Sequence, residues 1–176
     1  VGSEMCIRDS VNPQNYYGIS KLNGEKHIEN SNSESIVIRT SWLYSSFGKN
    51  FVKTIIEKSK SKDLLKIVGD QYGCPTNACD LANAIMQIIK SKDRFDKESK
   101  IYNFSNLGYT SWFEFAKAIL KGINIKCNLK EIKTNEISQL SKRPKFAITN
   151  KTKIISAFNL KIPDWKESLM KFLKKI

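Results

Sequence analysis

The sequence predicts a mixed α/β protein. From Pro13 onward, stretches with helical periodicity alternate with short β-branched stretches, and this order of elements is typical of α/β and α+β folds. Of the 176 residues, 40% are hydrophobic and 27% charged, which indicates a globular chain that can bury a sizeable core. Uncharged apolar stretches stay far below the roughly 18 residues that a membrane-spanning helix needs. We therefore expect an α/β domain without a membrane segment.

The first half of the chain starts with a helix, because Asn12 and Pro13 are typical of a helix start. Strands are indicated by runs of β-branched residues, and the second helix by apolar residues at helical spacing. In order, we expect a helix from Pro13 to about Asn30, a strand over 35–40, an aromatic loop over 41–50, a helix over 51–60, a strand over 64–68 and turns over 69–76.

The second half continues the alternation. Leu81, Ile85, Ile88 and Ile89 recur at helical spacing and predict the buried face of a helix. In order, we then expect a strand over 100–105, a helix capped by Thr110 or Ser111, an edge strand over 129–133, a helical turn over 135–140, an extended break at Arg143–Pro144, a helix over 149–158 and a final helix opened by Pro163.

The net charge of +13 suggests nucleic acid as a binding partner. Only four of the 30 basic residues are arginines, and the lysines are spread over the whole length rather than clustered. Abundant Lys, Ile and Asn are also what an A/T-rich genome encodes. We therefore predict no nucleic-acid partner. A basic nucleic-acid-binding module is the alternative that explains the charge alone, and it predicts binding with a steep salt dependence.

The cysteines and the single histidine do not form a metal-binding pattern. Cys6, Cys74, Cys79 and Cys127 lack CxxC spacing, and His27 has no second imidazole beside it in the sequence. We predict no metal ligands among these residues. Reduced thiols are typical of cytoplasmic proteins, so we expect that location.

The first ten residues differ in character from the rest of the chain. Val1–Ser10 lacks the basic start and continuous apolar segment of a signal peptide. The string GSEMCIRDS resembles translated sequencing adapter. We therefore interpret residues 1–10 as non-native and residues 11–176 as the protein itself, continued at its N-terminal side in a longer parent.

One pair of residues has a spacing that suggests acid–base catalysis. Tyr17 and Lys21 form a Y-x-x-x-K pattern on a predicted helix, where residues four apart lie on the same face. A phenol titrates near pH 10, and a nearby ammonium stabilises its ionised form. Such a pair can transfer a proton to or from an alcohol or ketone oxygen while a hydride moves at carbon. Tyrosine and lysine also occur four apart by chance in many helices, so the spacing alone is a weak signal.

Four sequence blocks strengthen the catalytic interpretation of this pair. They are NPQNYYGISKLNGE (Asn12–Glu25), IRTSWLY (Ile38–Tyr44), NFVKT (Asn50–Thr54) and GDQYGCPT (Gly69–Thr76). Their order and spacing continue into NFS, TSWFEFA, SKRP and PDW farther along the chain. Together these blocks resemble the dTDP-4-dehydrorhamnose reductases, which belong to the extended short-chain dehydrogenase/reductase superfamily. The resemblance covers residues 12–176.

The resemblance implies roles for individual residues. Tyr17 would protonate the C4 oxygen of the keto sugar, and Lys21 would hydrogen-bond the nicotinamide ribose and assist Tyr17. Thr40 and Ser41 would border the nicotinamide, and Trp42 would lie with its flat face against the sugar ring. Further residues would line the nucleotide-sugar side, namely Asn50, Gln71, Pro75, Thr76 and Arg143.

One motif of the superfamily, the glycine-rich cofactor loop, is missing from these residues, and this changes the expected fold. No G-x-x-G-x-x-G stands in these 176 residues, although such a loop holds the cofactor pyrophosphate in this superfamily. The resemblance therefore implies the C-terminal part of an NAD(P)-binding Rossmann-like fold, with the Tyr/Lys helix and the smaller substrate-binding lobe. The third catalytic residue, a Ser or Thr, would lie upstream. We expect this part to be inactive alone.

For the full-length parent, the resemblance implies reduction of dTDP-4-dehydro-L-rhamnose to dTDP-L-rhamnose with NADPH or NADH, in a cytoplasmic homodimer. The resemblance also allows Mg²⁺ to be bound in that dimer. Two alternatives stay open: a non-catalytic regulatory relative, of the type of the methionine adenosyltransferase regulatory subunit, or another sugar-nucleotide reductase or epimerase. Assaying sugar-nucleotide reduction separates the first alternative from the enzyme.

Overall fold

The computed structural model describes residues 13, 15–31, 34–91, 100–137 and 143–176. The helices are α1 (Tyr16–Glu29), α2 (Phe51–Ser61), α3 (Ala78–Lys90), α4 (Trp112–Ile123), α5 (Thr152–Phe158), α6 (Trp165–Leu173) and the 3-10 helix η2 (Thr134–Glu136). The strands are β1 (Ile36–Thr40), β2 (Leu43–Tyr44), β3 (Leu64–Val68), β4 (Tyr72–Gly73), β5 (Thr76–Asn77), β6 (Lys100–Phe104), β7 (Thr110–Ser111), β8 (Asn128–Ile132) and β9 (Phe146–Ala147). The mixed α/β class predicted from the sequence is confirmed.

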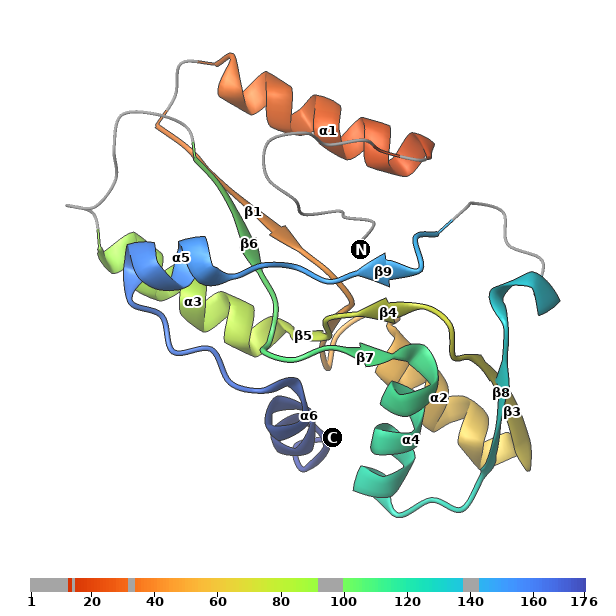
Figure 1. Cartoon of the computed structure of the whole chain (residues 1–176). Helices are drawn as coiled ribbons and strands as arrows, with labels where there is room; N and C mark the ends of the chain where they lie inside the picture. The colour runs from red at the N-terminus through yellow and green to blue at the C-terminus, as the bar shows by residue number, and fades with distance from the viewer. Residues whose placement is uncertain (1–12, 14, 32–33, 92–99, 138–142) are drawn as a thin grey trace.

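The described strands form four small sheets. β1 pairs in parallel with β6, β2 with β5, and β3 with β8. The fourth sheet has the order β7-β4-β9, in which β4 is antiparallel to β7 and parallel to β9. Parallel pairs require long crossover connections, and helices supply them here. Figure 1 shows β1 and β6 at one end of the molecule and β3 and β8 at the other.

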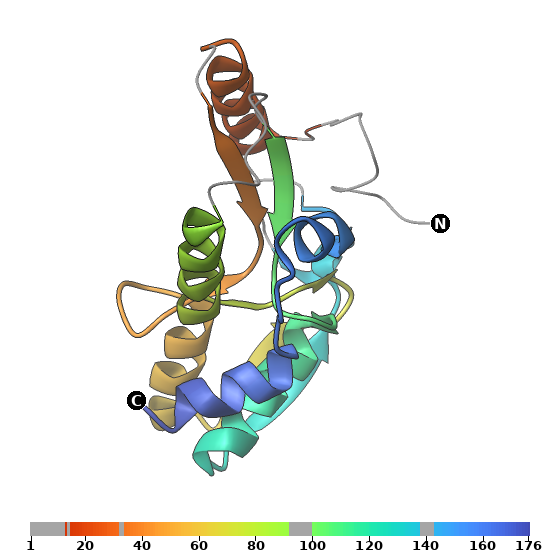
Figure 2. The ribbon, with the colours of Figure 1, turned by 90° about the vertical axis from the view of Figure 1, so that its left-hand side faces the viewer.

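Two apolar cores correspond to these two ends. In the first, buried side chains of α3, β6, α5 and the segment after α5 pack together, with Ile154 and Phe104 almost inaccessible. In the second, α2, α4 and α6 pack with β2 and β3 around Phe115 and Leu169. Figure 2 shows α3 and α5 on opposite sides of the β1–β6 pair, and α4 and α6 beside each other at the other end. The loops that join the two ends carry most of the predicted site residues.

Several predicted elements are corrected in detail. The first helix begins at Tyr16, because the side chain of Asn15 caps it by accepting a hydrogen bond from the Gly18 amide (2.8 Å). In α3, Ile88 is buried, whereas Ile85 and Ile89 are exposed, because the other elements cover that helix from one side only. The predicted turn over 135–140 is the 3-10 helix, and its last three residues lie outside the described part.

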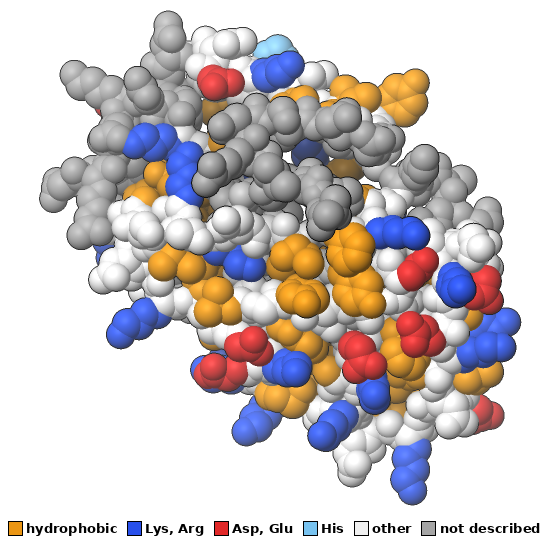
Figure 3. Space-filling view, in the orientation of Figure 1, with side chains coloured by type: hydrophobic (Ala, Val, Ile, Leu, Met, Phe, Trp, Pro, Cys, Tyr) orange, Lys and Arg blue, Asp and Glu red, His pale blue; other side chains and the backbone are white. Residues whose placement is uncertain are grey.

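The face seen in Figure 3 carries an apolar patch near its centre, over the β7-β4-β9 sheet. On this sheet, Tyr72 stacks on Phe146 with ring centroids 5.3 Å apart, and Phe146 is partly exposed. Within the described residues, none of the helices is both long and apolar enough to cross a membrane.

Candidate active site

The Tyr/Lys pair lies on α1, whose start is shaped by Gly18. A Cβ at this position would lie 2.9 Å from the Cβ of Pro13, so any larger residue here would require Pro13 to shift. Lys21 then places its ammonium 5.3 Å from the centre of the Tyr17 ring. The Tyr17 side chain is 72% exposed, and none of the described residues of α1 is buried. The i,i+4 contact predicted from the spacing is therefore present, and both groups are open to a ligand.

An ion pair joins α1 to β1. The carboxylate of Glu25 accepts hydrogen bonds from both Nε and Nη2 of Arg39, the first at 2.8 Å. The side chains retain only 14% and 26% of their accessible surface, respectively. Such a two-pronged pair fixes direction as well as distance. It connects the helix that carries Tyr17 and Lys21 to the strand that leads into Thr40.

Hydrogen bonds hold the loop after β1 against β5 and the segment before it. Thr40 donates to the Thr76 hydroxyl (3.2 Å), and that hydroxyl donates to the carbonyl of Ser41 (2.6 Å). Ser41 donates to the carbonyl of Cys74 (2.8 Å), and the Thr76 amide donates to the carbonyl of Trp42 (3.1 Å). The structure therefore brings together the predicted cofactor-side residues and part of the predicted substrate-side set.

Trp42 occupies an unusual position in this loop. Its backbone φ is +46°, although it is not a glycine. Its indole stacks on Trp112, with centroids 3.4 Å apart and planes 11° from parallel, and Gly73 packs on the ring as well. The ring is half-buried and one of its faces packs on Trp112, so its contact with the sugar ring stays a prediction.

The remaining predicted residues lie in loops and at the start of α2. Asn50 caps α2, accepting from the Lys53 amide (3.1 Å) and donating to the Ser45 carbonyl (2.7 Å). Gln71 is buried and donates to the Thr134 hydroxyl (3.1 Å). Pro75 is buried beside Thr76, and Arg143 is exposed just before β9. Asn50 and Gln71 therefore have structural partners, whereas Arg143 has its side chain in solvent.

Sequence reasoning missed Glu25, Arg39, Gly73 and Trp112 as parts of this region. The helical spacing places Trp112 only on the inner face of a helix, and its partner Trp42 lies 70 positions away in the chain. Glu25 and Arg39 both stand inside the blocks that carry the family resemblance, and this was the signal that could have found them.

A buried polar network lies under the start of α3. Asp80 accepts hydrogen bonds from Ser168 and from Asn106 (2.6 Å), and Asn77 donates to Ser168 (3.0 Å). The Asn77 amide donates to Asn106 (2.8 Å), so β5 is fixed to the segment after β6. Tyr44 lies beside this network, and burial raises the pKa of its phenol above the ordinary range. The network holds the segment that carries Thr76.

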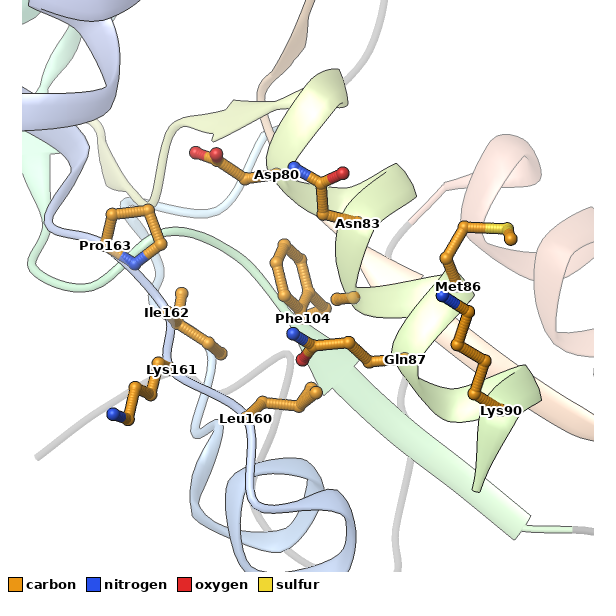
Figure 4. A pocket seen from close by; sticks show the side chains of 11 residues that line it. Asp80, Asn83, Met86, Gln87, Lys90, Phe104, Leu160, Lys161, Ile162 and Pro163 are labelled. Carbon is orange, nitrogen blue, oxygen red and sulfur yellow. The ribbon is translucent and has the colours of Figure 1, made fainter. Parts of the chain in front are cut away.

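A pocket of about 370 Å³ lies elsewhere, between α3 and the segment 160–163. Figure 4 shows Asn83, Gln87 and Lys90 on the helix side and Leu160 and Ile162 on the other. None of the residues predicted for the site lines it. The described residues also contain no group of three His, Cys, Asp or Glu side chains that could hold a metal.

Comparison with known proteins adds three relatives. The chain is 34% identical over 167 residues to the spore coat polysaccharide biosynthesis protein SpsK of Bacillus subtilis, and 34% identical over 171 residues to a dTDP-4-dehydrorhamnose reductase of Sinorhizobium fredii. These matches cover 95% and 93% of the chain and 56% and 57% of the relatives. A crystal structure of the dTDP-4-dehydrorhamnose reductase of Bacillus anthracis in complex with NADP matches with a TM-score of 0.86 at 35% identity, over 96% of this chain and 58% of that one.

The chain thus spans somewhat more than half the length of the relatives it matches. The model of the RmlD substrate binding domain matches residues 3–176. Both the length of this match and the order of the elements agree with the resemblance found in the sequence blocks. The chain belongs to the RmlD substrate-binding domain family.

Proposed function

We propose that the full-length gene product carrying this chain reduces dTDP-4-dehydro-L-rhamnose to dTDP-L-rhamnose with NADPH or NADH. The observation that carries the proposal is the exposed Tyr17–Lys21 pair on α1, tied to the strand that leads into Thr40 and Ser41. Figure 1 shows α1 and β1 running in roughly opposite directions, so that the start of α1 and the end of β1 point toward the same side. The family match and the reductase relatives support the substrate class.

In this proposal the nicotinamide cofactor supplies a hydride to C4 of the sugar. Tyr17 donates its phenolic proton to the C4 oxygen, so that the ketone becomes an alcohol and no charge remains on the sugar. Lys21 stabilises the phenolate left behind and hydrogen-bonds the nicotinamide ribose. Its ammonium is exposed, which suits a cofactor arriving from solvent. Thr40 and Ser41 border the nicotinamide.

On the substrate side, we propose that Trp42, Thr76 and Pro75 border the sugar nucleotide. The exposed guanidinium of Arg143 suits a diphosphate, to which it can donate two hydrogen bonds. Asn50 and Gln71 would contribute by shaping the loops, since their side chains have structural partners. A cytoplasmic homodimer, as expected from the resemblance, completes the proposal.

Replacing Tyr17 by Phe tests the proposal, because it removes the proton donor and keeps the ring. We expect turnover of the full-length product to fall by about 10² or more, the range of general acid catalysis, with little change in the Michaelis constant of the sugar nucleotide. Tyr16→Phe is the matched control, since Tyr16 is the adjacent residue and is 90% exposed. Steady-state assays of NADPH oxidation measure both. Wild-type turnover in Tyr17→Phe would eliminate Tyr17 as the acid.

A further inference from the structure

Trp42 is held in a backbone conformation that costs energy. Its φ of +46° lies in the left-handed region, where a bulky side chain is strained. Such strain persists only where the surroundings leave the residue no alternative. Contacts on both faces of the indole surround Trp42 in this conformation.

One face of the indole is covered by Trp112. The two ring systems are nearly parallel and their centroids are 3.4 Å apart, which leaves no space for a ligand between them. Trp112 is itself fixed, because its amide donates to the Gln71 carbonyl (3.4 Å) and its ring packs on Phe51 (centroids 4.4 Å apart).

Gly73 lies against the opposite face, near the ring-fusion atom Cε2. A Cβ at Gly73 would lie 2.5 Å from Cε2 of Trp42 and 2.7 Å from Cζ2 and Nε1. If this Cβ lay in the plane of the ring, it would be nearer to Cζ2 and Nε1 than to the ring-fusion atom Cε2. Because Cε2 is the nearest of the three atoms, the glycine lies over the face of the ring. The stacked indole of Trp112 fills the other face. Any side chain at position 73 would displace Trp42.

These contacts reach the hydrogen-bonded loop. The carbonyl of Trp42 accepts from Thr76, and the preceding Ser41 donates to the carbonyl of Cys74, next to Gly73. If the indole moved, φ of Trp42 could relax to a negative value, which would reorient the Ser41–Trp42 and Trp42–Leu43 peptide units. The hydrogen bonds that align Thr40, Ser41 and Thr76 would then be lost. The position of the ring thus sets the geometry of the loop.

We propose that Trp112 is a positioning residue, which together with Gly73 holds Trp42 between them, keeps the loop Thr40–Trp42 in its binding geometry and leaves the uncovered part of the Trp42 ring to the ligand. We call this arrangement, Trp42 between Trp112 and Gly73, the indole sandwich. The contact with a ligand rests on the proposed function. The geometry of the loop rests on the ring contacts and hydrogen bonds of Trp42 alone.

The test compares Trp112→Leu with Phe51→Leu in the full-length product. Both remove an aromatic ring from the same cluster, but Phe51 packs on Trp112 and Phe115, whereas Trp112 stacks directly on Trp42. Two stacked indoles give an exciton couplet in circular dichroism, which reports the sandwich without any assay. We expect Trp112→Leu to lose the couplet and to raise the Michaelis constant of the sugar nucleotide about tenfold or more. Phe51→Leu should keep both at wild-type values while lowering the melting temperature.

Gly73→Ala provides a second variant that leaves both indoles in the chain. It should weaken the couplet by displacing Trp42, and it should raise the same Michaelis constant. Trp112→Phe, which keeps a ring over Trp42, should restore most of the affinity that Trp112→Leu loses. A sandwich that only stabilises the fold would make Phe51→Leu and Trp112→Leu equal in Michaelis constant at equal loss of stability.

The outcomes separate the two proposals. If the wild-type protein shows the couplet but no reductase activity, the proposed function is rejected. The indole sandwich is then tested by the circular dichroism couplet of Gly73→Ala alone. An unchanged couplet in Gly73→Ala or Trp112→Leu overturns the sandwich. An unchanged Michaelis constant in Trp112→Leu, in an active enzyme, overturns the positioning role of Trp112.

Discussion

Asp70, two residues after the end of β3, is a single residue whose charge state affects the stability of the fold. Its carboxylate accepts hydrogen bonds from the Thr134 hydroxyl (2.6 Å) and the Thr134 amide (2.9 Å). These bonds, with a smaller effect of Lys145, hold the pKa of Asp70 below its ordinary value. Because the pKa is lower in the folded state than in the unfolded chain, the stabilisation is complete above about pH 4 and is lost as the pH falls through the folded value.

We therefore predict that Asp70→Asn flattens the acid side of the stability profile. The variant should melt below the wild type at neutral pH, and the difference should shrink as the pH falls below about 4. Asp63→Asn is the control, since Asp63 is exposed and nearby in the chain. Thermal unfolding followed by circular dichroism across this pH range measures both. A constant difference between wild type and Asp70→Asn at all pH values would contradict the assignment.

At the residue scale, the sequence was informative where a contact is local. The contact between Tyr17 and Lys21 follows from helical spacing alone, because four residues make about one turn. The contact between Trp42 and Trp112 depends on how β1, β4 and α4 meet, and no local pattern encodes it. The capping role of Asn50 also went unnoticed, although an Asn directly before an apolar helical run is a cap signal.

At the element scale, α1 is a helix with very little burial, and the Glu25–Arg39 pair is its described ionic link to β1. Tyr17 lies eight residues before Glu25, about 12 Å along the axis. A change of tilt at Glu25 would therefore be amplified at Tyr17.

We predict that Glu25→Gln loosens α1 and lowers stability by about 1–2 kcal/mol, the range for a charged hydrogen bond that is partly open to water. The peptide that covers α1 should exchange its amide hydrogens faster, as mass spectrometry can measure. Glu29→Gln, at the exposed end of the same helix, should exchange like the wild type. Unchanged protection of α1 in Glu25→Gln would show that other contacts hold the helix.

Elements with strong periodicity were predictable, and those defined by their neighbours were not. β3 was located to the residue by its apolar and β-branched run, and β1 within one residue. Strands β2, β4, β5 and β7 have two residues each, and they exist only because a distant strand pairs with them. Periodicity also assigned Ile85 and Ile89 to a buried face, since it detects an apolar stripe but not whether a neighbour covers it.

At the scale of the whole molecule, apolar surface flanks an open sheet. In the described residues, β1 has β6 on one edge and no strand on the other. Exposed apolar side chains lie on the two helices of this end, namely Tyr16, Tyr17, Ile19 and Ile28 on α1 and Ile85, Met86 and Ile89 on α3. An open strand edge beside apolar patches favours self-association.

We predict that the 176-residue chain produced alone self-associates with increasing concentration and does not bind NADPH with micromolar affinity. Sedimentation velocity and titration calorimetry measure the two properties. Met86→Lys combined with Ile89→Lys should reduce association, whereas Leu64→Lys, an exposed apolar position at the start of β3, should not. Micromolar binding of NADPH would show that these residues suffice for the cofactor.

The sheet topology also has a consequence for how the chain is made. Ile36 of β1 pairs with Lys100 of β6, and Leu64 of β3 with Asn128 of β8, so each partner follows 64 residues later (100 − 36 and 128 − 64). At synthesis rates of about 5–20 residues per second, β1 and β3 each leave the ribosome roughly 3–13 seconds before the strand they pair with. During that interval their backbone groups and apolar side chains are available to chaperones or to neighbouring nascent chains. Slower translation between residues 40 and 100 should therefore lower the yield of native protein.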